Sequence, residues 1–133
     1  MLTHLNIKNF AVVQTLSIDL QSGLSVITGE TGAGKSIAVD ALGLVLGDRA
    51  DTGIIRDGTE RAEISASFDI SANPLARQWL DEQGLENDEC ILRRVLSRDG
   101  RSRAFVNGST ATLSQLREIG ESLIDIHSQH EHQ

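Results

Sequence analysis

The stretch Gly29-Glu30-Thr31-Gly32-Ala33-Gly34-Lys35-Ser36 matches the pattern G-x-x-x-x-G-K-[ST] at every fixed position. Its glycines let the backbone curl so that successive N–H groups point inward, where they can donate to phosphate oxygens. The lysine brings a compact positive charge to the β- and γ-phosphates, and the serine hydroxyl can ligate magnesium. The pattern therefore predicts a phosphate-binding loop for a nucleoside triphosphate, with Mg-ATP as the expected ligand.

The residues on both sides of this loop are those that its mechanism needs. Leu24-Ser25-Val26-Ile27 predicts a short apolar strand before it. Residues 37–46 are apolar almost all the way round, which predicts a helix that is buried on most faces and ended by Gly47. Such a helix directs the positive end of its dipole at the bound anion. A flexible glycine loop without a ligand is the alternative, and the glycines do not fit the dinucleotide pattern G-x-G-x-x-G.

Alternating apolar and polar residues mark further strands along the chain. The strands expected on this basis are residues 2–7 and 16–20, joined through Asn9-Phe10, and residues 61–70, 89–97 and 102–107. Asp99-Gly100 predicts the hairpin turn between the last two strands, because these residues tolerate the positive φ angles of tight turns. Asn107-Gly108 predicts a second turn, and the polar residues 48–60 predict a loop.

Two helix starts follow from capping residues. Asn73-Pro74 predicts a capped start with a first-turn proline, and Gly84 is expected to close that helix. Thr112 with Gln115 resembles a capping box. The helix after it should bury its apolar positions, Leu113, Leu116, Ile119 and Leu123. A strand-like apolar run over residues 123–126 is then expected to lead into the polar residues 127–133.

Composition limits the class of protein. The 133 residues suit one domain or one lobe of a larger one, and the net charge of −7 argues against DNA contact as the main role of this segment. A local basic patch can still bind DNA. Cys90 is the only cysteine, so no internal disulfide can form, and a buried thiol in a reducing compartment is expected. No signal peptide or membrane-spanning stretch is apparent, which favours a cytoplasmic protein without a membrane partner.

The chain resembles the RecN family of bacterial DNA repair proteins, whose ATPase heads are SMC-like and of the ABC type. The segments that carry the resemblance to this family are residues 26–37 with 40–42, 92–95, 100–103 with 106–108, and 126–133, and residues 5–11 resemble the opening strand of SMC-like heads. They cover essentially the whole chain, and the last of them, Ile126-His127-Ser128-Gln129-His130-Glu131-His132-Gln133, is the most particular to the family.

The resemblance implies an α/β P-loop fold in which an antiparallel β-subdomain packs on a parallel core. Residues 1–133 would be the N-terminal lobe, lobe I, of the head. The C-terminal lobe of such proteins follows a long coiled coil and carries the second acidic magnesium motif, the catalytic glutamate and the signature loop, none of which is visible in this sequence. ATP is sandwiched between two heads, so the full-length protein would be an ATPase and the isolated chain a very weak one or none.

The resemblance also assigns roles to residues. Gly29 to Ile37 would contact the nucleotide, and Arg56 would reach the nucleotide or DNA. Lys35 and Gln129 would act in catalysis, and Ser36 and Gln129 would hold magnesium. Gln129 follows the apolar run where the family places its Q-loop glutamine, with Gln133 as the substitute position. An ordinary surface glutamine is the alternative there, and a solvated loop arginine is the alternative for Arg56.

Two side-chain clusters and the function itself leave alternatives open. The hairpin arginines form either a solvated strand face or a contact to DNA or a partner protein; they are Arg93, Arg94, Arg98, Arg101 and Arg103. His127, His130 and His132 suggest either metal binding or a polar Q-loop segment. The expected function is an ATPase in DNA double-strand break repair and recombination. An SMC-type structural tether for double-stranded DNA ends, in which ATP mainly joins the heads, and a P-loop kinase are the alternatives.

Overall fold

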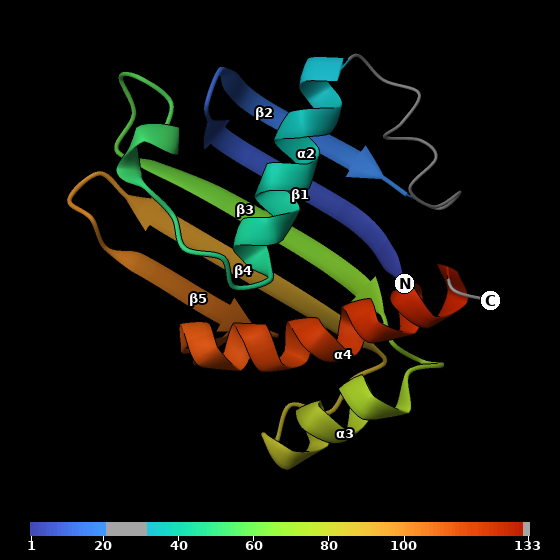
Figure 1. Cartoon of the computed structure of the whole chain (residues 1–133). Coiled ribbons are helices and arrows are strands. Elements are labelled where there is room, and N and C mark those ends of the chain that lie inside the picture. The colour runs from blue at the N-terminus through green and yellow to red at the C-terminus, as the bar shows by residue number, and fades with distance from the viewer. Residues whose placement is uncertain (21–31, 132–133) are drawn as a thin grey trace.

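A six-stranded sheet organises the chain (Figure 1). The computed structural model describes residues 1–20 and 32–131, with the backbone alone for residues 32, 33 and 125–131. The strand order is β2-β1-β3-β4-β5-β6, and every neighbouring pair is antiparallel. The strands are β1 (Leu2–Phe10), β2 (Val13–Asp19), β3 (Arg61–Asp69), β4 (Glu89–Ser97), β5 (Ser102–Val106) and β6 (Ser109–Ala111).

The first hairpin is longer than predicted. β1 continues through Phe10, so the turn lies at Ala11 and Val12 and not at Asn9-Phe10. Phe10 is buried and bridges to Ile55, which keeps the strand extended to this point. The turn region uses positive φ angles of 53° at both Asn9 and Ala11.

The β4–β5 hairpin and the turn after it form at the predicted residues. Gly100 has a φ of 94° between β4 and β5, and Asn107 and Gly108 have φ angles of 48° and 82° before β6. The Asn107 side chain accepts from the amide of Ile91 at 2.7 Å, which fixes this turn against β4. The short strand β6 was not predicted, and it exists because the Asn107-Gly108 turn folds residues 109–111 back on β5.

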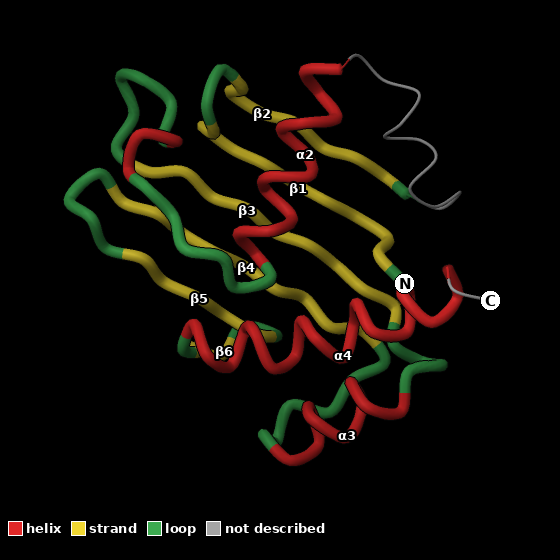
Figure 2. The backbone as a smooth tube through the Cα atoms, viewed as in Figure 1, coloured by secondary structure: helices red, strands yellow, loops and turns green. Residues whose placement is uncertain are grey.

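Two helices cover one face of the sheet, and a third lies beside them (Figure 2). The helices are α2 (Gly32–Val45), α3 (Pro74–Glu82) and α4 (Leu113–Glu131), with a short 3-10 turn η1 at Thr52–Ile54. α2 and α4 lie on the same face, and α3 packs beyond α4. The core between them and the sheet contains fully buried residues from every layer, including Leu5, Ile64, Ala41, Leu92 and Leu116. No described helix is long and apolar enough to cross a membrane.

The run over residues 123–126 belongs to α4, and the prediction of a strand-like segment there is wrong. The helical period that begins with Leu116 and Ile119 continues through Leu123, all three of which are buried. A strand at this point would turn every second side chain away from the face that these leucines and isoleucine occupy. α4 therefore extends without a break to Glu131.

The parallel core and the burial of α2 were the other expectations for the fold. All described strand pairs are antiparallel, and the expected strand at residues 24–27 lies outside the described residues. α2 is buried only on the side that faces the sheet: Val39 is 57% exposed on the other side. The prediction that α2 is buried on most faces is therefore wrong for this chain taken alone.

The caps of α3 and α4 form as predicted. The Asn73 carbonyl oxygen Oδ1 accepts from the amide of Ala76 at 3.1 Å, and its Nδ2 donates to the backbone of Ser122 in α4 at 3.3 Å. Thr112 and Gln115 exchange two bonds, of 2.9 and 3.1 Å, across the start of α4. Asn73 is buried and its bond to Ser122 links α3 to α4, whereas the Thr112 cap is exposed.

Replacing Asn73 by alanine should lower the free energy of unfolding by about 1–2 kcal/mol. The change removes a helix cap and leaves the buried amide of Ala76 without its acceptor. Urea unfolding followed by circular dichroism measures the loss. Thr112→Ala is the matched control and should cost less, because water can replace an exposed cap. Equal losses in the two variants would contradict the interpretation of Asn73 as a buried link between α3 and α4.

Candidate nucleotide-binding site

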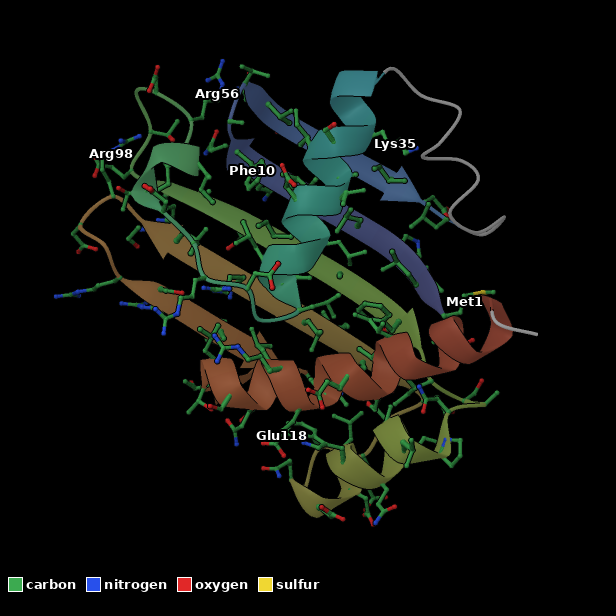
Figure 3. The ribbon with its side chains drawn as sticks, viewed as in Figure 1. Met1, Phe10, Lys35, Arg56, Arg98 and Glu118 are labelled. Atoms are coloured by element: carbon green, nitrogen blue, oxygen red, sulfur yellow. The ribbon has the colours of Figure 1, made fainter. Side chains whose placement is uncertain are left out.

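The predicted phosphate-binding residues open helix α2. Gly32 to Ser36 form its first turns, and the side chains of Lys35 and Ser36 are exposed there (Figure 3). Gly29, Glu30 and Thr31 lie outside the described residues. The amides of a first helical turn have no carbonyl partner within the helix, and the helix dipole adds partial positive charge at this end. No acidic side chain in the first turn competes with an anion.

A strip of apolar side chains, two of them alanines, packs α2 on the sheet. Ala38, Ala41, Leu44 and Val45 are buried against β1, β3 and β4, and Ile37 is half-buried at the start of the helix. Because two of these residues are alanines, the helix axis can come close to the strands. The first turn of α2 lies at the β2 edge of the sheet (Figure 1), and Lys35 and Ser36 are exposed there.

The other end of α2 is held by two arginines. Gly47 ends the helix with a φ of 113°, as predicted. Arg94 from β4 is 2% exposed and donates from Nη1 to the carbonyls of Leu44 at 2.6 Å and Asp48 at 2.7 Å. Arg117 from α4 donates to the carbonyl of Gly47 at 3.1 Å. Burial lowers the pKa of Arg94, the charge of Arg117 lowers it further, and Asp48 opposes both effects.

Sequence reasoning placed Arg94 in a surface cluster, and the structure corrects this. The signal that identifies it is the strand period, because Arg94 has the same parity as the buried residues Leu92 and Leu96. Its Nε donates to Ser102 Oγ at 2.8 Å, so the guanidinium has several partners inside the protein. Arg94 is therefore neither a solvated strand residue nor a contact for DNA.

The other four hairpin arginines are exposed and differ in their contacts. Arg93 points to the opposite face of β4, where it pairs with Glu63 and lies 4.9 Å from the ring centre of Phe105. Arg98 donates to three backbone carbonyls in residues 55–59, at 2.8 to 3.4 Å. Arg101 and Arg103 are exposed, and Arg101 lies 3.5 Å from the carboxylate of Asp99. Four of the five hairpin arginines are thus exposed, and a contact of these four to DNA or a partner protein stays a prediction.

Arg56 lies in a loop that is fixed to the end of β1. Its amide donates to the carbonyl of Asn9 at 2.9 Å, and its own carbonyl accepts from Arg98 at 3.0 Å. In Figure 3 the side chain lies beside the β1–β2 turn, whereas Lys35 projects from the far side of α2. The structure thus does not bring Arg56 and Lys35 together, and a role for Arg56 at the nucleotide stays a prediction.

Residue 129 lies within α4, so the prediction that Gln129 follows a strand is wrong. Gln133 and His132 lie outside the described residues, and the side chains of His127 and His130 are likewise not described. Among the described residues no group of three or more His, Cys, Asp or Glu could hold a metal ion. The roles of Gln129 in magnesium binding and catalysis remain predictions.

Cys90 is fully buried in β4, as expected, and this burial raises the pKa of its thiol to about 12. The thiolate is the reactive form, so Cys90 should react at least 100-fold more slowly with an aromatic disulfide reagent at pH 8 than after unfolding in urea. The absorbance of the released thiol measures both rates. Reaction of the folded chain at the unfolded rate would show that Cys90 is accessible.

Comparison with known proteins agrees with this architecture. A family model described as an AAA domain matches residues 4–131. The chain is 55% identical over 134 residues to a DNA repair protein RecN of Vibrio cholerae, and 54% identical to one of Haemophilus influenzae. The matches cover 100% and 98% of this chain, which spans about a quarter of the length of these curated relatives, 24% in each case.

A solved structure gives the same result for the fold. It is described as "Structural biochemistry of ATP-driven dimerization and DNA stimulated activation of SMC ATPases", and it superposes with a TM-score of 0.73 at 25% sequence identity. The match covers 92% of this chain and 79% of the solved one. The SMC-head-like fold and the family match over residues 4–131 together assign the chain to a family. The chain belongs to the AAA domain family, and it is similar to the N-terminal region of RecN proteins.

Proposed function

We propose that this chain is the nucleotide-binding N-terminal lobe of a RecN-like ATPase head and that it binds Mg-ATP through residues 29–37. The observation that carries the proposal is the place of Lys35 and Ser36, which are exposed in the first turn of α2 directly after the glycines of the pattern. Family membership supports nucleotide binding in general. ATP is the specific ligand that we infer.

Each residue has a role that follows from its chemistry. The Lys35 ammonium neutralises charge on the β- and γ-phosphates, and the Ser36 hydroxyl ligates magnesium. The amides of the first turn of α2 donate to phosphate oxygens. Gln129 contacts magnesium or the attacking water, and Arg56 supplies a further positive charge. These two roles rest on the family resemblance, whereas those of Lys35 and Ser36 also follow from the residue pattern of the loop.

The exposed side of α2 indicates where a partner of this lobe binds. Val39 and Asp40 are exposed on the side of α2 that faces away from the sheet, and the chain spans 24% of its relatives. We infer that the C-terminal lobe of the same protein covers this side. A second head then closes over the γ-phosphate, in line with the ATP-driven dimerization described for the similar SMC ATPases.

The isolated chain should hydrolyse ATP at a rate no more than about a hundredth of that of the full-length protein. It can stabilise phosphate charge, but it has no identified general base for the attacking water. Phosphate release from both proteins at saturating Mg-ATP measures this ratio. Robust turnover by the 133-residue chain that is abolished by Lys35→Ala would contradict the proposal that this lobe binds ATP but needs the rest of the head for hydrolysis.

In the full-length protein we infer that ATP-driven closure of the heads controls the binding or tethering of double-stranded DNA ends during break repair. The relatives are DNA repair proteins by name, and the setting would be the bacterial cytoplasm and nucleoid. The alternative is a structural tether in which ATP mainly joins the heads and hydrolysis only releases them. A P-loop kinase would need an acceptor site, and the family match disfavours it.

The salt dependence of DNA binding separates the first two possibilities. Each phosphate contact adds about 0.9 to the slope of log affinity against log salt. If turnover drives DNA handling, the slope for the full-length protein should differ between ATP and a non-hydrolysable analogue. If ATP only joins the heads, both nucleotides should give the same slope. An unchanged slope on adding any nucleotide would contradict control of DNA binding by ATP.

A further inference from the structure

The C-terminal end of α2 is fixed by an arginine clamp, which we define as Arg94 and Arg117. Three carbonyls at this end of the helix accept from the clamp, those of Leu44, Gly47 and Asp48. The two arginines come from β4 and from α4, which are separate parts of the chain. The end of α2 is therefore fixed relative to the sheet and to α4 at the same time (Figure 1).

Close packing around the clamp depends on two glycines. A Cβ atom on Gly47 would lie 2.5 Å from Cγ of Arg117, and one on Gly120 would lie 3.1 Å from the carbonyl oxygen of Leu46. The first distance is shorter than real Cβ contacts, and the second is tighter than nine in ten of them, so a side chain at either position would force the neighbouring residues to shift. The approach of the two helices is thus specified at the same place as the arginine contacts.

The clamp also brings two positive charges together. Arg117 lowers the pKa of the buried Arg94, which means that the two guanidinium groups repel each other. The negative end of the α2 dipole and the nearby Asp48 offset this repulsion. An apolar side chain could fill this space without bringing two like charges together. The two arginines therefore indicate that hydrogen bonds to the carbonyls of α2 matter at this position.

The hydrogen bonds of the arginine clamp fix the position of α2 along its axis, which its apolar packing alone does not do. Burial of apolar surface is non-directional, and the small side chains of Ala38 and Ala41 offer little resistance to a shift of the helix along its axis. Hydrogen bonds to carbonyls depend on distance and angle, so they fix both the axial position and the rotation of the helix. From Leu44 back to Lys35 the helix is a rigid rod of about 14 Å.

We propose that Arg94 and Arg117 are positioning residues of the nucleotide site, which fix through α2 where Lys35 and Ser36 meet the phosphates. The inference rests on the proposed function, because it concerns the same site. It assigns no contact with the nucleotide to either arginine. It predicts that a change at one end of α2 alters phosphate binding at the other end.

The test uses one conservative change on two faces of the same strand. Arg94→Lys keeps the charge but cannot reproduce the forked contacts to two carbonyls and Ser102. Arg93→Lys is the matched control, since its side chain faces Glu63 and Phe105 and not α2. Arg117→Met is a second, more exposed variant that guards against a failure of Arg94→Lys to fold. Urea unfolding first confirms that each variant is folded under the assay conditions.

Two readouts then separate the possible results. In the nucleotide-free chain, hydrogen exchange of the α2 amides should speed up at least fivefold in Arg94→Lys and Arg117→Met, and less than twofold in Arg93→Lys. The dissociation constant of Mg-ATP, from calorimetric titration, should rise at least fivefold in the first two variants and less than twofold in the control. A purely structural role would lower the urea midpoint without changing this constant.

The outcomes that overturn the proposal are distinct. Faster exchange in α2 with an unchanged dissociation constant would make the clamp structural only, and unchanged exchange would show that it does not hold the helix. Equal effects in Arg94→Lys and Arg93→Lys would also overturn it. If the unmodified chain binds no Mg-ATP, the proposed function fails and this inference fails with it, while the exchange data still show whether the clamp holds α2.

Discussion

Replacing Lys35 by alanine should weaken Mg-ATP binding by about 10- to 100-fold. Hydrogen bonds to charged groups contribute about 1.5–3 kcal/mol, and each 1.4 kcal/mol is a factor of ten in affinity. Lys35 is exposed at the positive end of α2, so its removal should leave the fold intact and change only the charge that meets the phosphates. Calorimetric titration of the chain with Mg-ATP measures the effect.

The sequence offers a matched control for this change, because it contains one other lysine, Lys8. Lys8 is exposed on β1, where its strand partners are Thr15 and Glu63. Lys8→Ala removes the same charge from a strand and not from the start of α2, so the affinity for Mg-ATP should change less than twofold. Equal losses in the two variants would show that binding depends on net charge and not on the phosphate loop.

Replacing Arg94 by alanine should lower the free energy of unfolding by about 3–5 kcal/mol. The buried carbonyl of Leu44 and the part-buried carbonyl of Asp48 would lose their donor, at about 1–3 kcal/mol each, and the lost side-chain volume adds to the cost. The total free energy of unfolding of a small domain is about 5–15 kcal/mol, so the expected loss is a large share of its stability. The midpoint and slope of urea unfolding measure the loss.

Arg93→Ala is the control for this second experiment. Arg93 pairs with Glu63 and contacts Phe105 on the exposed face of β4, where ion pairs and cation–π contacts are each worth about 1 kcal/mol or less. The loss in Arg93→Ala should therefore be less than half of that in Arg94→Ala. If the two variants were equally stable, the buried contacts of Arg94 could not be holding the end of α2.

Local signals predicted the fold well wherever one residue type dictates a backbone geometry. Asp99-Gly100 and Asn107-Gly108 predicted their turns, Asn73-Pro74 predicted the start of α3, and Gly47 ended α2. Each of these cases depends only on local steric preferences or on one cap, so no distant contact can overrule it easily. The β4–β5 hairpin was predicted from the same kind of signal.

Errors arose where tertiary contacts decide the structure. The apolar run at residues 123–126 fits a strand or a helix by pattern, and packing against the sheet and α2 selected the helix. The role of Arg94 was missed because a charged residue suggests a surface position, although its place in the strand period points inward. The exposure of Val39 was not predicted either, because an apolar pattern around a helix does not show which of its faces the sheet of this chain covers.

The most direct test of the central claim is a titration of the isotope-labelled chain with Mg-ATP, followed by the chemical shifts of its backbone amides. If residues 29–37 bind the polyphosphate, their amides should shift most, and Lys35→Ala should reduce those shifts at the same ATP concentration. The exposed face of β1 and β2 should hardly change. Shifts that leave residues 29–37 unaffected, or that concentrate elsewhere in the chain, would contradict the claim.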